Sequence, residues 1–269
     1  EIADGDWSSD VCSSDLTMAD ESTHDYFDSI AAFYDAKYRD QEIGDRDFYL
    51  EKARTADGPV LEVAVGTGRV YLDLLREGID ADGFDISANM LDVLRQKADD
   101  AGLDPTVWQA DMTEFETDRE YDLVIVPFRA FLHLIDLEDQ LAALDRFHEA
   151  LAPGGELLIS SFVPNLEVIC ETYGEWTDET FERDGERYTV RSKQEIIDEV
   201  DQVMWEHQQY YDADGELVDS AEFRLKLITR REFELLFRAS PFAEWTVQGG
   251  FDGDDLETWD QEMVWTATR

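Results

Sequence analysis

A glycine turn that directly follows a buried strand constrains the fold of this chain more than any other feature. Residues 59–75 read PVLEVAVGTGRVYLDLL, in which apolar residues surround one acid, Glu62, until the glycine turn 66–68 interrupts them. Helical spacing of apolar residues begins at Val70. This order is typical of a parallel strand followed by a helix, in which glycine lets a ligand approach the backbone and the helix start offers it N–H groups. The segment therefore predicts an α/β fold with a nucleotide-cofactor site.

Two residues in this segment bear on which cofactor is bound. A dinucleotide-binding turn needs a small third residue so that helix and strand can pack closely, and the chain has Tyr71 there. A dehydrogenase has no evident use for Glu62, whereas a cofactor with a cationic amino-acid portion does. Both residues argue against a nicotinamide-dependent oxidoreductase, which remains the less favoured alternative.

The run Glu62-Val63-Ala64-Val65-Gly66-Thr67-Gly68 resembles the first motif of the class I S-adenosylmethionine (SAM)-dependent methyltransferases, an acid followed by a glycine-rich turn. Ala64 departs from the pattern, since that family usually has its first glycine there. The resemblance covers roughly residues 23–269. It implies a Rossmann-like, seven-stranded, mostly parallel sheet flanked by helices.

Strand-like runs alternate with helical or loop segments along the chain, and this alternation ends after the fifth strand. Runs with strand character occupy 81–86, 107–112, 121–128 and 156–162, each of the first four strands being followed by a helical or loop segment. From 164 to 229 the pattern becomes hairpin-like, with a turn at 213–215. We expect 164–229 to form an antiparallel β insertion after the fifth strand, within one domain spanning 18–269.

The resemblance also assigns cofactor residues. Asp85 ends the second strand, where an acid can accept both ribose hydroxyls, and Asp111 ends the third, where the family binds the adenine amino group. Tyr34 belongs to an early Tyr-Asp-x-x-Tyr element that folds over the cofactor in the small-molecule branch. The expected cofactor-binding residues are Tyr34, Glu62, Ala64, Gly66, Thr67, Gly68, Asp85, Ile86, Met90, Asp111, Met112 and Pro127.

Candidate catalytic and substrate-binding residues follow the fourth strand. His133 matches a histidine of the amino-sugar N-methyltransferases, and histidine titrates in the range that a general base needs. A structural imidazole between Leu132 and Leu134 explains the position equally well. Tyr34 is a second catalytic candidate, with core packing as its alternative. Arg129 is expected to hold an anionic substrate group or to be a structural arginine.

The composition restricts partners and compartment. The chain has 65 acidic and 22 basic residues and a net charge of −43, which disfavours nucleic acid and anionic membranes as partners. With 43% hydrophobic residues the chain is expected to fold, so we interpret the charge as adaptation to high salt in a halophile's cytoplasm. The histidines and cysteines never stand at metal-ligand spacing, so no metal is expected, although a carboxylate-bound magnesium ion stays open.

The first 17 residues are treated separately. Residues 6–16, DWSSDVCSSDL, read like a translated sequencing adapter, so we expect 1–17 to be a non-native leader. For the rest, the sequence predicts a SAM-dependent methyltransferase acting on a nitrogen or oxygen of a small molecule, similar to amino-sugar N-methyltransferases. A SAM-binding protein without methyl transfer is the other alternative. The acceptor, the pathway and the oligomeric state stay open.

Overall fold

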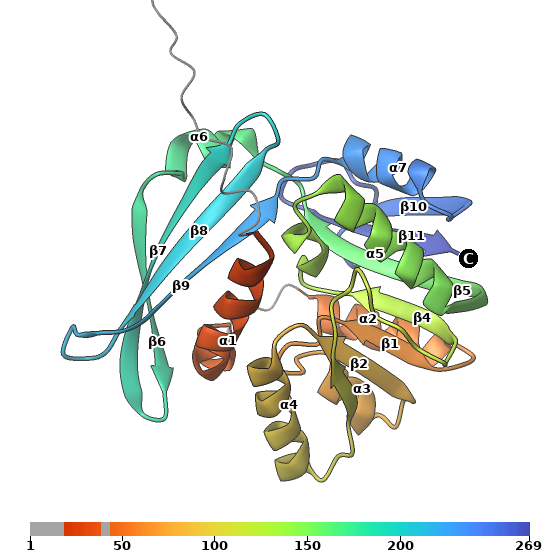
Figure 1. Cartoon of the computed structure of the whole chain (residues 1–269), viewed down its shortest axis with the longest axis horizontal. Coiled ribbons are helices and arrows are strands. Elements are labelled where there is room, and N and C mark those ends of the chain that lie inside the picture. The colour runs from red at the N-terminus through yellow and green to blue at the C-terminus, as the bar shows by residue number, and fades with distance from the viewer. Residues whose placement is uncertain (1–18, 39–43) are drawn as a thin grey trace, which may run out of the picture.

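The computed structural model describes residues 19–38 and 44–269, and the side chains from Tyr26 onwards. The predicted leader, residues 1–17, lies outside this part of the chain. Two sheets and the helix between them dominate the architecture (Figure 1). None of the helices in the described part of the chain combines the length and the apolarity that crossing a bilayer requires.

Sheet A has seven strands, and five of them lie in the regions predicted for the first five strands. In the order of the sheet, its members are β10 (Glu244–Gly249), β11 (Glu262–Thr268), β5 (Leu151–Phe162), β4 (Tyr121–Val126), β1 (Val60–Val63), β2 (Ala81–Asp85) and β3 (Thr106–Gln109). All neighbours pair in parallel except β11, which is antiparallel to both β5 and β10. The predicted seven-stranded, mostly parallel sheet is therefore confirmed.

Helices cover this sheet and provide the crossover connections. They are α2 (Asp45–Thr55), α3 (Tyr71–Arg76), α4 (Ala88–Ala101), α5 (Leu137–Ala150) and α7 (Arg230–Ala239), with the short 3-10 helix η1 (Ala130–His133) after β4. Ser87 caps α4 by accepting a hydrogen bond from Met90 N, and Thr229 forms a capping box at α7. Asp136 occupies the N-cap position of α5, but its side chain makes no capping hydrogen bond.

Sheet B is the antiparallel insertion. Its strands follow the chain in the order β6 (Trp176–Arg183), β7 (Glu186–Asp198), β8 (Val203–Tyr211) and β9 (Leu217–Lys226), after a short helix α6 (Leu166–Thr172). Helix α1 (Ala19–Lys37) lies between this sheet and the helical side of sheet A, as Figure 1 shows. The insertion is thus held against the parallel sheet through α1.

The structure differs from the sequence-based expectation near the fifth strand. Helix α5 ends at Ala150 and β5 begins at Leu151, before the predicted run 156–162, so the Pro-Gly-Gly segment at 153–155 lies inside the strand. The pairing of β5 with β4 shifts register between Tyr121 and Leu123, and Gly154 adopts φ 86°. The segment therefore forms a bulge that only a glycine accommodates without strain.

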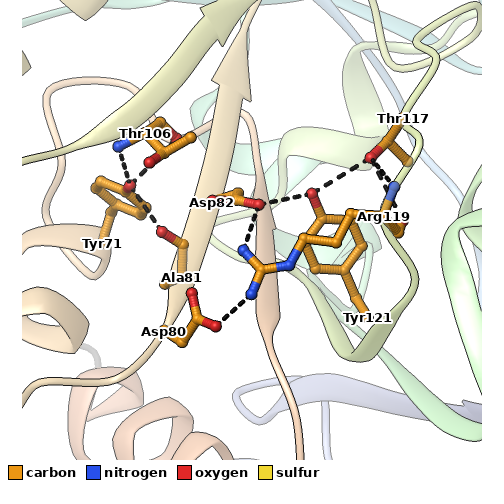
Figure 2. A network of polar contacts seen from close by, with 8 residues as sticks. All are labelled: Tyr71, Asp80, Ala81, Asp82, Thr106, Thr117, Arg119 and Tyr121. Atoms are coloured by element: carbon orange, nitrogen blue, oxygen red, sulfur yellow. Dashed lines mark hydrogen bonds and ion pairs between the residues drawn. The ribbon is translucent and has the colours of Figure 1, made fainter.

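Tyr71, the bulky residue after the glycine turn, ties three elements together (Figure 2). Its fully buried hydroxyl donates to the carbonyl of Ala81 at 2.9 Å and accepts from the N–H of Thr106 at 3.0 Å. Nearby, Asp82 accepts hydrogen bonds from Arg119 at 2.8 Å and from the hydroxyl of Tyr121 at 2.9 Å (Figure 2). These contacts fix α3 against the starts of β2 and β3, so the large side chain serves packing where a dinucleotide turn needs space.

Candidate functional site

A cavity of about 730 Å³ opens where the carboxyl ends of the sheet A strands face sheet B. One part of its lining comes from α1, the strand ends and the segment after β4, and another part comes from the inward face of sheet B. Ligands of open parallel sheets bind at this end of the strands. The cavity is therefore the candidate site.

The glycine turn is bound to the acid at the end of β2. The N–H of Gly66 donates to Oδ2 of Asp85 at 2.8 Å, and the N–H of Ser87 donates to Oδ1 at 2.9 Å. Burial raises the pKa of Asp85 to about 6, although these N–H groups oppose the shift. Each carboxylate oxygen keeps a further lone pair for a ligand hydroxyl.

Ala64 stands in a backbone conformation that favours glycine. Its φ is 55°, and Gly66 and Gly68 have φ values of 53° and 85°. A left-handed alanine carries a strain of about 1–2 kcal/mol. The departure from the family's usual first glycine is thus accommodated in a strained conformation.

The cavity brings most of the predicted site residues together. Its lining includes Tyr34, Ala64, Gly66, Asp85, Ile86, Met90, Asp111, Met112, Pro127, Arg129 and His133. Glu62, Thr67 and Gly68 do not line it. The side chains that meet here come from segments spread over about a hundred residues of sequence, as expected for strand ends at one edge of a sheet.

The three predicted residues outside the lining have other contacts. Glu62 is 2% exposed, and its Oε2 has no hydrogen-bond partner among the described residues. Burial raises the pKa of Glu62 well above the usual range, although Arg69 opposes this shift. The hydroxyl of Thr67 donates to Asp35 of α1 at 2.5 Å. A Cβ on Gly68 would lie 2.8 Å from Cγ of Leu72, so this glycine makes room for α3 and not for a ligand.

Asp111 at the end of β3 is held by the residue that follows Met112. Its Oδ1 accepts from both the N–H and the hydroxyl of Thr113, each at 2.7 Å. This turn fixes the carboxylate in the cavity lining. The other oxygen, Oδ2, takes no part in these two hydrogen bonds. The arrangement offers one acceptor beside the backbone N–H of Met112, the pairing that an adenine edge needs.

His133 lies at the end of η1, between two aromatic rings. Its ring centroid is 5.1 Å from that of Phe27 and 5.5 Å from that of Phe223. Burial lowers its pKa to about 4, opposed by a hydrogen bond to the backbone of Arg224, and buried Nδ1 has no hydrogen-bond partner. The imidazole is therefore neutral at pH 7 and titrates below the range that the sequence suggested.

Helix α1 is anchored over the cavity by its acids. Asp35 accepts from Thr67 and from Lys97 Nζ at 2.7 Å, while Asp28 accepts from the hydroxyl of Ser87 at 2.5 Å. The ring of Tyr34 lies 4.7 Å from that of Tyr38, and burial raises the pKa of Tyr34 well above its usual value. Tyr34 is thus a neutral hydroxyl that lines the cavity.

Arg129 lines the cavity but already has an anionic partner. Its guanidinium forms an ion pair with Glu262 and stacks over the ring of Phe162 at 5.1 Å. Arg129 is the N-cap residue of η1 and has a φ of 68°. An anionic ligand would have to compete with Glu262 for this arginine.

Sequence reasoning did not identify the residues that sheet B contributes. Its inward face, here called the sheet B wall, consists of Thr177, Glu179, Ser192, Gln194, Met204, Glu206, Phe223 and Leu225. Strand alternation places these side chains on one face, but the sequence does not say which face meets the cavity. Within the described residues, no group of three or more His, Cys, Asp or Glu side chains could hold a metal ion.

Comparison with known proteins gives the geometry a family context. Residues 60–155 match the model of a methyltransferase domain. The chain is 31% identical over 137 residues to dTDP-3-amino-3,4,6-trideoxy-alpha-D-glucopyranose N,N-dimethyltransferase from Streptomyces venezuelae, covering 50% of this chain and 56% of the relative. It is 26% identical over 245 residues to dTDP-3-amino-3,6-dideoxy-alpha-D-glucopyranose N,N-dimethyltransferase from Streptomyces fradiae, covering 87% and 91%. The chain thus spans about half the length of the first of these relatives.

Solved structures extend the similarity beyond the matched domain. The CcbJ methyltransferase from Streptomyces caelestis superposes with a TM-score of 0.71 at 23% identity, covering 92% of this chain and 98% of that one. A SAM-dependent methyltransferase from Clostridium acetobutylicum also gives a TM-score of 0.71, at 17% identity, covering 89% and 97%. Residues 60–155 thus match a methyltransferase domain, and the chain as a whole shares the fold of these solved structures.

Proposed function

We propose that this protein is a SAM-dependent methyltransferase that acts on a nitrogen or oxygen of a small molecule. The observation that carries the proposal is the convergence of the glycine turn, Asp85 and Asp111 on one cavity. Each group suits a different part of the cofactor, since ribose hydroxyls and an adenine amino group donate hydrogen bonds to carboxylates. The relatives with amino-sugar substrates support a small-molecule acceptor.

The cavity residues fit this cofactor. Asp85 would accept the ribose hydroxyls, Asp111 and the N–H of Met112 would meet adenine, and Met90 and Ile86 would pack beside it. Glu62 does not line the cavity and has a raised pKa, so it would act from behind the turn only once the ammonium of the cofactor's amino-acid portion favours its ionised form. SAM, when bound, supplies an electrophilic methyl group.

His133 and Tyr34 are proposed to position the acceptor. The neutral imidazole of His133 lines the cavity, so its ring can orient an acceptor by contact while the lone pair of the nucleophile faces the methyl group. Tyr34 offers a neutral hydroxyl from α1, and sheet B and α1 exclude water. Positioning of this kind supplies much of the rate acceleration in a two-substrate reaction.

Two measurements test the proposal. Calorimetry should detect binding of S-adenosylhomocysteine, and incubation with SAM and a panel of amines and hydroxy compounds should release S-adenosylhomocysteine. Binding without release from any acceptor would favour the second candidate, a SAM-binding protein without methyl transfer. Absence of binding would refute both.

The charge of the chain supports a further part of the proposal. A net charge of −43 destabilises a compact protein by self-repulsion at low ionic strength, and salt screens this repulsion. We propose a halophile's cytoplasm as the setting, with small molecules and neither nucleic acid nor membranes as partners. Residues 18–269 would form the catalytic domain with 164–229 inserted, and 1–17 would be dispensable.

A further inference from the structure

The sheet B wall carries one acid whose surroundings orient it strictly, Glu206 on β8. It lies directly opposite Gln194 of β7 and opposite Phe223 of β9. Gln194 Nε2 donates to Oε2 of Glu206 at 2.8 Å, and Gln208 Nε2 donates to Oε1. Both carboxylate oxygens are thus held by amides while the group lines the cavity.

The amide of Gln208 is itself fixed from behind. Gln208 is fully buried, and its Oε1 accepts from the hydroxyl of Tyr210 at 2.6 Å and from that of Tyr26 at 3.4 Å. Since the tyrosines occupy the carbonyl oxygen, the NH₂ group must face Glu206. A chain of hydrogen bonds therefore runs from the tyrosines of α1 and β8 through Gln208 to Glu206. Because this chain ends on the NH₂ group of Gln208, the side chain at position 206 must be a hydrogen-bond acceptor.

The ion pairs of the described residues leave Glu206 without a cationic partner. Among the described residues it forms no ion pair with Lys, Arg or His, whereas Arg129 on the other side of the cavity is paired with Glu262. Lys37 also lines the cavity, but its ammonium lies over the rings of Tyr38 at 4.8 Å and Tyr210 at 5.9 Å. The charged lining contains six acids, Asp85, Asp111, Asp136, Asp139, Glu179 and Glu206, against these two basic side chains.

A partly buried carboxylate with fixed amide donors and no counter-ion is a site for a cation. We propose that Glu206 selects the acceptor by binding a cationic amine, so that the acceptor is an amino compound and not a neutral alcohol or an acid. The ammonium passes one proton to the Glu206 carboxylate, which frees the nitrogen lone pair for attack on the methyl group, and the methylated amine keeps the positive charge that the sulfonium loses. Phe223, directly across from Glu206 and 5.5 Å from the His133 ring, gives the amine's carbon skeleton an apolar surface beside the proposed positioning residue. This inference rests on the proposed function.

The test compares two probes that differ in a single group, D-glucosamine and D-glucose. Thermal unfolding is followed with each probe at equal concentration in 2 M KCl, which screens non-specific attraction to the acidic surface. We expect the amine to raise the melting temperature of the wild type by about 2–4 °C more than the alcohol does. In Glu206→Gln the difference should vanish.

Glu222→Gln is the matched control. Glu222 precedes Phe223 on β9, is exposed, and points to the opposite face of the sheet, so its replacement removes the same charge outside the cavity. This variant should retain the full difference. Equal shifts from both probes in the wild type, or a preserved difference in Glu206→Gln, would overturn the inference.

A separate measurement distinguishes this inference from the proposed function. Affinity for S-adenosylhomocysteine should be the same in the wild type and Glu206→Gln, which also verifies that the variant folds. If Glu206→Gln does not fold, the wild-type comparison of the two sugars decides alone. Loss of adenosylhomocysteine binding by the wild type would refute the proposed function without touching the amine result.

Discussion

The backbone N–H of Gly66 donates a hydrogen bond to the carboxylate of Asp85 at 2.8 Å, which joins the turn after β1 to the end of β2. If this carboxylate also accepts ribose hydroxyls, Asp85→Ala should weaken binding of S-adenosylhomocysteine by about 10- to 150-fold. This corresponds to about 1.5–3 kcal/mol for a hydrogen bond to a charged group. Calorimetry measures it, with Asp99→Ala on the exposed side of α4 as the control. Unchanged affinity would remove Asp85 from the site.

The raised pKa of Asp85 predicts a pH dependence of the same affinity. With a pKa of about 6 in the free protein, the carboxyl is ionised above pH 6 and protonated below it. A ligand that binds the ionised form therefore binds most tightly well above pH 6, and its affinity falls as the pH drops through 6. We expect about tenfold weaker binding at pH 5 than at pH 7. Asp85→Asn should show a flat profile, and a flat wild-type profile would contradict the assignment.

Ala64 predicts an easy gain in stability. Ala64→Gly relieves the strain of φ 55° but loses some backbone entropy, so the expected net gain is about 0.5–1 kcal/mol. Urea unfolding measures this gain. Ala142→Gly, within helix α5, should instead lose about 1 kcal/mol. A loss of stability in both variants would show that Ala64 carries no strain.

His133 separates chemistry from cofactor binding. His133→Asn should lower turnover by about 10²-fold, because a misplacement of the acceptor by about 1 Å can cost that much, while affinity for S-adenosylhomocysteine stays unchanged. His148→Asn makes the same substitution in α5, away from the cavity lining, and should turn over like the wild type. Equal turnover of the wild type and His133→Asn at saturating acceptor would exclude the positioning role, and failure of His133→Asn to fold would indicate a structural one.

Salt dependence tests the interpretation of the net charge. The melting temperature should rise steeply as KCl increases towards molar concentrations, because the Debye length falls to about 3 Å at 1 M. Thermal scans at fixed pH measure the rise, and sucrose of equal osmolality serves as the uncharged comparison. A melting temperature that is flat or falls with KCl would contradict adaptation to salt.

Local patterns made the parallel sheet predictable from the sequence. Buried strands, the glycine turn and the acid at Asp85 are each encoded within a few residues, and the cavity lies where their order places it. The sequence did not reveal β6, since WTDETFER is mostly exposed and lacks an apolar face. The roles of Glu206 and Gln194 depend on the register of two strands and on which face meets α1, which no local pattern specifies. The low pKa of His133 likewise follows from rings contributed by α1 and β9.

Sheet B enters the chain as one uninterrupted segment between β5 and α7, yet it provides one whole wall of the cavity. Recombination could therefore exchange this segment as a unit while the strand ends of sheet A keep their geometry. Related proteins would then share the cofactor-binding part of the cavity and diversify through the inward positions of four strands. A library restricted to those positions is the economical route to new acceptor preferences on this scaffold.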